Sequence, residues 1–288
     1  MKIFMSNWIH PLQSRVTGAV HTEERRFMRA WSVVYPVLLY YVAGSLCIML
    51  FAYFMQWISG QDGMWDSLAE ILREYSTITS AVVNGLSMLI GVAVVLPLLK
   101  KEKLQLSMPK GHAKDIPLLF LAGAATALFF NILFSLLQIT GSSGSYAEVA
   151  QRQFSLPLGA GLILYGIISP LAEEIVFRGL AYNGLYRHFG RPVAIVGSAL
   201  LFGLYHGNMV QALYGFILGL FIAVVYERYG SFLVPVLLHS AANICVYVIS
   251  ANTLWQEAVM NLGMCAGSGI LAAVLMVWLL FDKSQDKE

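Results

Sequence analysis

The stretch GIISPLAEEIVFRGL, residues 166–180, carries three ionisable side chains inside a largely apolar segment. Glu173, Glu174 and Arg178 lie within six positions of one another. Burying an ionised group in hydrocarbon is costly, so charges inside a membrane segment usually have a partner or a function. This stretch therefore indicates a membrane helix that carries part of a functional site.

The composition of the whole chain is typical of a membrane protein. Of its 288 residues, 58% are hydrophobic and only 12% are charged, whereas an ordinary soluble domain has roughly 25% charged residues. Intrinsic disorder is excluded because disordered chains are poor in apolar residues. The net charge of +2 provides no basic surface, so we expect no nucleic-acid partner. Cys47, Cys245 and Cys265 lie in apolar runs without CxxC spacing and predict neither disulfides nor a sulfur-based zinc site.

Hydropathy predicts how the chain is organised. A bilayer core about 30 Å thick needs about 20 apolar residues per helix, and eight stretches qualify. We expect them at residues 30–56, 77–99, 116–138, 158–186, 191–207, 209–226, 231–250 and 258–281. The predicted fold is an all-α membrane protein, a bundle of about eight transmembrane helices. One membrane domain, 30–281, would follow an N-terminal segment, 1–29, and precede a tail, 282–288.

The positions of the basic residues predict the orientation, because Lys and Arg concentrate in cytoplasmic loops. With eight spans and a cytoplasmic N-terminus, fifteen of the 18 Lys and Arg residues fall on the cytoplasmic side. Only Arg73 and Arg152 fall in outer loops, and Arg178 lies within a span. Both termini are therefore expected in the cytoplasm, with the acidic loop 57–76 outside, where it could form a short amphipathic helix.

The two glutamates are predicted to be unequal. Glu174 and Arg178 are four residues apart, on one helical face, and suit a structural ion pair. Glu173 lies about 100° round the helix from Glu174 and needs a polar partner from another helix. Two neighbouring spans provide candidates: His206 ends one apolar run, and His239 lies one turn before Asn243 in another.

Such a set of residues suits hydrolysis. A glutamate and a histidine on either side of a water can share general acid and base work. An asparagine and a second histidine can donate hydrogen bonds to a developing oxyanion. The same atoms could instead hold zinc, although HExxH is absent and any metal site would need Glu173, His206 and His239 from three helices. The other four histidines, His10, His21, His112 and His188, lie in polar segments and are expected to be solvated.

Three motifs resemble one known family. EEIVFR at 173–178 matches EExxxR, FGLYH at 202–206 matches FxxxH, and HSAAN at 239–243 matches HxxxN. In this order on consecutive membrane helices, they resemble the CPBP (Abi) family of intramembrane proteases. That family includes the type II CAAX prenyl endopeptidases and proteins linked to bacteriocin processing or immunity. The resemblance covers about residues 155–250, which would be the catalytic core.

The resemblance implies a function for each motif residue. Glu173 and His206 would activate the attacking water, and His239 and Asn243 would stabilise the oxyanion. Glu174 and Arg178 would support the site, while Phe202 is equally well explained by packing. The family has been described both as metalloproteases and as metal-independent glutamate proteases. We expect no required cofactor, with zinc as the alternative, because no metal-ligand spacing is present.

The expected function is an intramembrane endopeptidase of the CAAX prenyl protease type in a bacterial cell membrane. Its partners would be membrane lipids and a peptide or protein substrate, lipidated or not; the sequence identifies neither the substrate nor the oligomeric state. The alternatives are a non-proteolytic immunity or peptide-binding protein and a proton-coupled transporter, although the chain lacks the internal repeats common in transporters.

Two further expectations concern geometry. Glu173 and His206 can share a water if the fourth helix continues through AYNGLYRHF to about residue 189 and the fifth begins below the membrane surface. Arg187, Arg191 and Arg228 lie near the ends of the helices that bear the site, so we expect its cavity to open toward the basic, cytoplasmic half.

Overall fold

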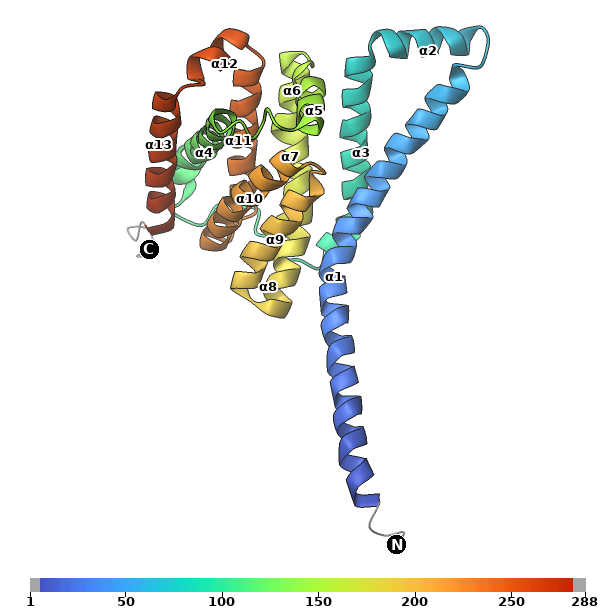
Figure 1. Ribbon diagram of the computed structural model, residues 1–288, viewed down its shortest axis with the longest axis vertical. Coiled ribbons are helices and arrows are strands. Elements are labelled where there is room, and N and C mark those ends of the chain that lie inside the picture. The colour runs from blue at the N-terminus through green and yellow to red at the C-terminus, as the bar shows by residue number, and fades with distance from the viewer. Residues whose placement is uncertain (1–5, 282–288) are drawn as a thin grey trace.

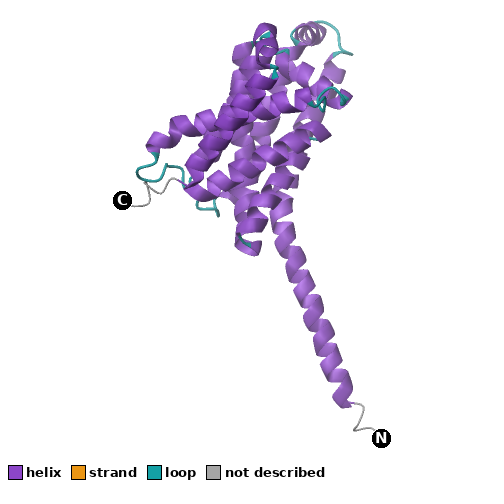
Figure 2. Cartoon of the chain, turned by 60° about the vertical axis from the view of Figure 1, so that its left-hand side comes forward, coloured by secondary structure: helices purple, strands orange, loops and turns teal. Residues whose placement is uncertain are grey.

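The computed structural model describes the backbone of residues 6–281 and the side chains of residues 27–281. Residues 1–5 and the predicted tail 282–288 lie outside the described residues. Across the described chain all regular structure is helical, and no strand occurs (Figure 2). The expected all-α bundle is therefore confirmed.

Seven helical segments within residues 6–281 are long and apolar enough to cross a bilayer, so the chain is an integral, multi-pass membrane protein. They are Phe27–Ile58, Ser76–Leu99, Ala113–Leu136, Leu158–Phe189, Met209–Tyr229, Leu233–Ser250 and Leu262–Phe281. The remaining predicted span, 191–207, is helix α9 (Arg191–Tyr205). Its 15 residues measure only about 22 Å, so it is too short to cross the bilayer fully.

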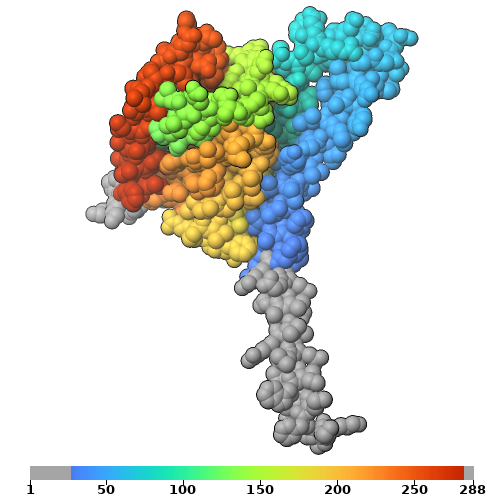
Figure 3. Space-filling model, viewed as in Figure 1, coloured from blue at the N-terminus to red at the C-terminus, as the bar shows by residue number. Residues whose placement is uncertain are grey.

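The first three helices form one wall of the bundle. Helix α1 (Ser6–Ile58) packs against α3 (Ser76–Leu99), and α2 (Met64–Glu74) runs crosswise between their ends (Figure 1). The acidic loop thus contains the expected short helix. This wall, blue to cyan in Figure 3, flanks the rest of the packed body.

The opposite wall is formed by α4 (Ile116–Leu136), α11 (Leu233–Ser250) and α13 (Leu262–Phe281). Helix α4 packs against both of the others. A Cβ atom built on Gly123 would lie 2.2 Å from the carbonyl oxygen of Leu238, so only glycine allows α4 and α11 to approach this closely. An apolar core joins this wall to α10 (Met209–Tyr229), whose buried residues include Leu218, Ile222 and Val225.

A long, irregular helix passes between the two walls. It consists of α6 (Leu158–Ile163), the π-helical segment η2 (Leu164–Ile168), α7 (Ser169–Glu174), the π-helical segment η3 (Ile175–Tyr182) and α8 (Asn183–Phe189). It ends before Gly190, whose φ of 83° is readily adopted only by glycine. The helix therefore continues to residue 189, as expected if Glu173 and His206 are to share a water.

Helices α9 and α10 form a hairpin beside the long helix. The turn between them, 206–208, contains Gly207 with φ 74°, and Asn208 caps α10 by accepting a hydrogen bond from the Gln211 amide. A Cβ atom on Gly203 would lie 2.5 Å from the Ala212 carbonyl oxygen. The absence of a side chain at Gly203 thus lets the two helices pack closely against each other.

The short connecting helices mark one end of the bundle. Helices α2, α5 (Gly144–Phe154) and α12 (Thr253–Val259) lie at the top of Figure 1, whereas α8 lies at the other end. The loop 100–112 and the 3₁₀ turn η1 (Ala113–Asp115) connect α3 to α4. The structure contains no membrane, so the orientation inferred from the basic residues stays a prediction.

Candidate active site

The site begins with an irregularity in the long helix. The Ser169 amide donates to the carbonyl of Leu164, five residues earlier, which is the π-helical pattern. In that pattern the next carbonyl, on Tyr165, would accept from residue 170, but Pro170 has no N–H group. The side-chain amide of Asn243 on α11 donates to the Tyr165 carbonyl instead, at 2.9 Å. The irregular turn thus fixes Asn243 against the helix that carries the glutamates.

Glu173 lies one turn after this irregularity and is 5% exposed. Its Oε1 atom accepts a hydrogen bond of 2.6 Å from the Ser169 hydroxyl. Its Oε2 atom lies 3.7 Å from Nε2 of His239. The partner from another helix that burial of Glu173 requires is therefore His239, and the carboxylate is held from two sides.

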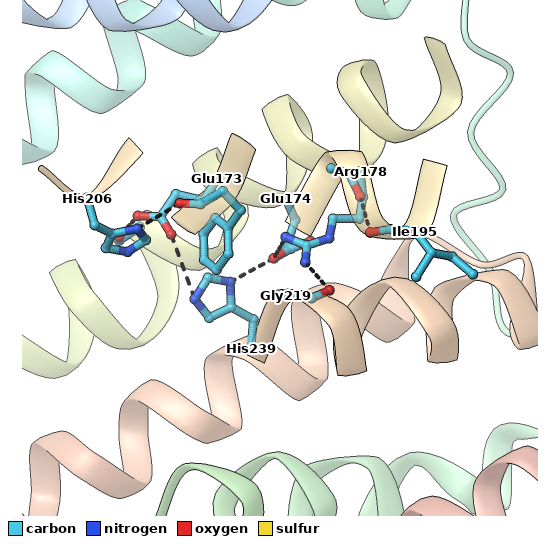
Figure 4. Close-up of polar contacts among 10 residues, drawn as sticks. Glu173, Glu174, Arg178, Ile195, His206, Gly219 and His239 are labelled. Carbon is cyan, nitrogen blue, oxygen red and sulfur yellow. Dashed lines mark hydrogen bonds and ion pairs between the residues drawn. The ribbon is translucent and has the colours of Figure 1, made fainter. Parts of the chain in front are cut away.

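Glu174 and Arg178 form the expected ion pair. Arg178 Nη1 donates to Glu174 Oε1 at 3.0 Å, and both side chains are fully buried. Arg178 Nη2 donates to the carbonyl of Gly219 on α10, at 2.9 Å. His239 Nδ1 lies 2.7 Å from the same Glu174 oxygen. Glu174 and Arg178 therefore connect the long helix to both α10 and α11 (Figure 4).

His206 occupies the C-terminal cap of α9. Its Nδ1 atom lies 2.9 Å from the carbonyl oxygen of Phe202. A carbonyl can only accept, so Nδ1 carries the proton, and in the neutral ring Nε2 is a free acceptor. The backbone of α9 thus selects the tautomer that can accept a proton through Nε2.

Phe202 packs against the polar residues rather than only filling space. Its ring meets the rings of His206 and His239 edge to face, with centroids 4.9 and 5.4 Å apart. The Arg178 guanidinium lies 5.0 Å from the centroid of the same ring. Phe202 is 1% exposed, so it fixes the orientations of both histidines and covers the buried cation.

A cavity of about 460 Å³ brings the predicted residues together. Glu173, His206, His239 and Asn243 all line it, and Figure 4 shows the side chains of Glu173, His206 and His239 converging. Glu174 and Arg178 do not line the cavity and lie behind it. The residues assigned to chemistry and those assigned to support are thus separated in space.

The cavity does not open toward the basic loops, contrary to the expectation from Arg187, Arg191 and Arg228. Its remaining walls come from the half of the bundle that contains α5, including Tyr146 and Arg152 on that helix and Tyr41 and Asn84 on α1 and α3. None of its lining residues belongs to the basic loops 100–114, 187–191 or 228–231. Basic loops report how a chain is oriented but not where its helices separate, and here the helices separate beneath α5.

One of the lining residues on α5 is a buried tyrosine. Burial raises the pKa of the Tyr146 phenol above its ordinary value, so at neutral pH this hydroxyl stays protonated.

The side chains considered for zinc do not form a metal site. Among residues 27–281, no group of three His, Cys, Asp or Glu side chains is arranged to hold a metal ion. Glu173, His206 and His239 therefore share a cavity without forming the compact donor set that zinc requires.

Several contacting groups were not singled out from the sequence. Ser169 and the carbonyls of Tyr165 and Gly219 each bond a site residue. The spacing of Ser169 four residues before Glu173 was the only available signal, because a sequence does not indicate which backbone carbonyls will accept side-chain hydrogen bonds.

The expectation that His112 is solvated is wrong: it is 9% exposed and bonds Asp115 at 2.8 Å. The Tyr229 ring packs against it edge to face, with the ring centroids 5.2 Å apart.

Fold and site together define a class: a helical membrane protein with a glutamate and two histidines around a cavity inside the bundle. Residues 155–245 match the family described as Type II CAAX prenyl endopeptidase Rce1-like. The resemblance of the three motifs to CAAX prenyl endopeptidases of the CPBP type is thereby confirmed for this part of the chain.

Two bacterial relatives extend the comparison. The chain is 28% identical over 180 residues to the "Putative membrane peptidase YdiL" of Bacillus subtilis (strain 168), covering 59% of this chain and 70% of that protein. It is 29% identical over 121 residues to the "UPF0177 protein YxdF" of Lactococcus lactis subsp. lactis (strain IL1403), covering 42% of this chain and 67% of that protein. No solved structure matches. At the level of the family, these matches support a CAAX-type membrane peptidase acting on a peptide or protein.

Proposed function

We propose that the protein is an intramembrane endopeptidase that hydrolyses peptide bonds of membrane-associated peptides or proteins. The observation that carries the proposal is the convergence of Glu173, His206 and His239, from three separate helical segments, on one cavity within the bundle. A buried carboxylate and two histidines have no reason to surround a cavity in a protein that only packs its helices.

The nucleophile is a water between Glu173 and His206. Oε2 of Glu173 is the carboxylate oxygen that the Ser169 hydroxyl leaves free, and Nε2 of His206 is an acceptor because Nδ1 donates to the Phe202 carbonyl. One of these acceptors takes a proton as the water oxygen attacks the scissile carbonyl carbon. The same proton is then delivered to the leaving amine, which completes hydrolysis without a covalent enzyme intermediate.

The oxyanion is stabilised by His239 and Asn243. The buried cluster contains the carboxylates of Glu173 and Glu174 and one guanidinium, Arg178. The cluster as a whole is therefore neutral when His239 carries a proton on both of its ring nitrogens. His239 Nε2–H can then donate to the oxygen that becomes negative. Asn243 uses one amide hydrogen on the Tyr165 carbonyl and keeps the second for the same oxygen.

We propose further that the reaction requires no metal ion. The argument is the donor arrangement: among residues 27–281, no three His, Cys, Asp or Glu side chains are grouped so that they could hold a metal ion. The substrate is a peptide segment that reaches the cavity within the membrane, with or without a lipid attached.

The test is cleavage by purified protein in detergent. A mixture of synthetic peptides, half of them carrying a C-terminal lipid, would be incubated with the protein and analysed by mass spectrometry. We expect peptide products that persist when a zinc chelator is added. Loss of all products with the chelator, and their return with added zinc, would overturn the metal-free proposal.

Two variants separate this activity from a contaminating protease. Glu173→Gln should remove the products, whereas Glu148→Gln, on an exposed side chain of α5, should leave them unchanged. Products of equal amount from Glu173→Gln and the unchanged protein would overturn the assignment of the active site.

A further inference from the structure

Ser169 makes an unusual hydrogen bond for a serine inside a helix. Such a hydroxyl commonly donates back to the carbonyl three or four residues earlier. Ser268 on α13 does so, donating to the Met264 carbonyl at 2.6 Å, and Ser87 on α3 donates to Asn84 at 2.8 Å. The Ser169 hydroxyl instead points forward along its helix and donates to Glu173 Oε1 at 2.6 Å.

The reason lies in the π-helical turn that precedes Pro170. The carbonyl four residues before Ser169 is that of Tyr165, which already accepts the Asn243 amide at 2.9 Å. One of the two backbone carbonyls that a helical serine commonly uses is therefore already bonded by a side chain from α11. Ser169 is 5% exposed, and its hydroxyl donates to the carboxylate of Glu173 one turn further on.

This bond decides which carboxylate oxygen faces the reaction. With Oε1 held by Ser169, the Glu173 side chain is restricted to a conformation in which Oε2 faces Nε2 of His239. A glutamate without this restraint would sample other rotamers in a cavity of about 460 Å³. Hydrolysis depends on such restraint, because the rate falls steeply when a reacting group is misplaced.

We propose that Ser169 is a positioning residue for Glu173, and that Asn243 sets its direction by occupying the Tyr165 carbonyl. This inference rests on the proposed peptidase function. It assigns Asn243 a second contribution, through the backbone, in addition to its direct donation to the oxyanion. The unit consists of Asn243, Tyr165, Ser169 and Glu173, on two helices.

The experiment compares three serine variants in the peptide cleavage assay. Ser169→Ala should lower kcat roughly 10- to 100-fold, as expected when a reacting group is misplaced. KM should stay within about twofold, because the substitution removes only one hydroxyl from the cavity wall. Ser169→Thr, which keeps the hydroxyl, should recover most of kcat. Ser268→Ala removes a buried helical hydroxyl outside the cavity and should leave kcat unchanged. If Ser169→Ala does not fold, Ser169→Cys replaces the hydroxyl by a weaker donor of similar size.

A double variant tests the link to Asn243. If Asn243 acts partly through Ser169, the fold-loss of kcat in the double variant should be smaller than the product of the losses in Asn243→Ala and Ser169→Ala. Multiplication of the two losses would overturn the link. A kcat of Ser169→Ala equal to that of the unchanged protein would overturn the positioning inference itself.

Infrared spectroscopy distinguishes failure of this inference from failure of the proposed function. The carboxylate band of Glu173 is identified by its loss in Glu173→Gln, and it should shift in Ser169→Ala but not in Ser268→Ala. If Glu173→Gln still cleaves peptides, the function is wrong, and a shifted band still supports the bond. If the band does not shift, the positioning inference is wrong whatever the activity.

Discussion

His239 Nδ1 lies 2.7 Å from Oε1 of Glu174, a full ångström closer than its Nε2 atom lies to Glu173, at 3.7 Å. The histidine is thus anchored by the supporting glutamate and presents its other nitrogen to the reacting one. Arg178 completes the anchor by bonding Glu174 and the Gly219 carbonyl. Two adjacent glutamates therefore have separate tasks, one holding three helices together and the other facing the cavity.

Glu174→Gln should destabilise the protein by about 3 kcal/mol, because it leaves Arg178 as a buried cation without a charged partner. Thermal unfolding in detergent measures this change. The matched control is Glu148→Gln, whose carboxylate is exposed and should be replaceable without effect. A melting temperature of Glu174→Gln equal to that of the control would contradict a structural role for the pair.

Glu173→Gln should reduce peptide cleavage at least about 100-fold, because an amide retains hydrogen bonds but cannot accept the proton of water. Its melting temperature should stay close to that of the unchanged protein, since Ser169 can still donate to the amide oxygen. Cleavage rates and melting curves measured on the same preparations separate the two effects. Large instability of Glu173→Gln would show that its role is structural.

Gly203→Ala should destabilise the α9–α10 hairpin by about 1 to 3 kcal/mol, because the new methyl group would lie 2.5 Å from the Ala212 carbonyl oxygen. The shift should also displace His206 and lower cleavage. Gly159→Ala is the control: nothing lies within 4 Å of its Cβ position, and alanine favours a helix. Unfolding curves that rank Gly203→Ala as the more stable variant would refute this packing.

A cysteine at position 211 should react with a water-soluble thiol reagent, because Gln211 is only half-buried and lines the cavity. Val225→Cys, fully buried and further along α10, should stay protected. Cys47, Cys245 and Cys265 are first replaced by serine. The reagent should reach position 211 from the same side of the membrane as a cysteine at 142, next to α5. Reaction only from the opposite side would refute a cavity that opens beneath α5.

The same reagent tests the orientation predicted by the basic residues. Engineered cysteines at 60–72 and 142–152 should react from outside the cell, and those at 104–112 should be protected until the membrane is permeabilised. The last six residues should also be protected from outside. The opposite pattern would mean that the termini lie outside and that the cavity faces the cytoplasm after all.

The sequence by itself determined the helical bundle and part of the site, because both depend on residues that are close together in the chain. Runs of about 20 apolar residues predict membrane helices whatever their neighbours are, and the seven long spans lie close to where they were expected. The pair between Glu174 and Arg178 follows from a spacing of four on one helix, which fixes the two side chains on the same face.

The tertiary structure alone decided how the helices meet around the reacting groups. The bond between His239 and Glu174 joins residues 65 positions apart, and that between Asn243 and Tyr165 joins residues 78 apart. Such contacts depend on the packing angle and depth of two helices, which hydropathy does not encode. The same packing turned Ser169 toward Glu173 and opened the cavity beneath α5 rather than at the basic loops. Charge in the loops governs how a helix inserts, whereas the shapes of facing side chains govern where space is left between helices.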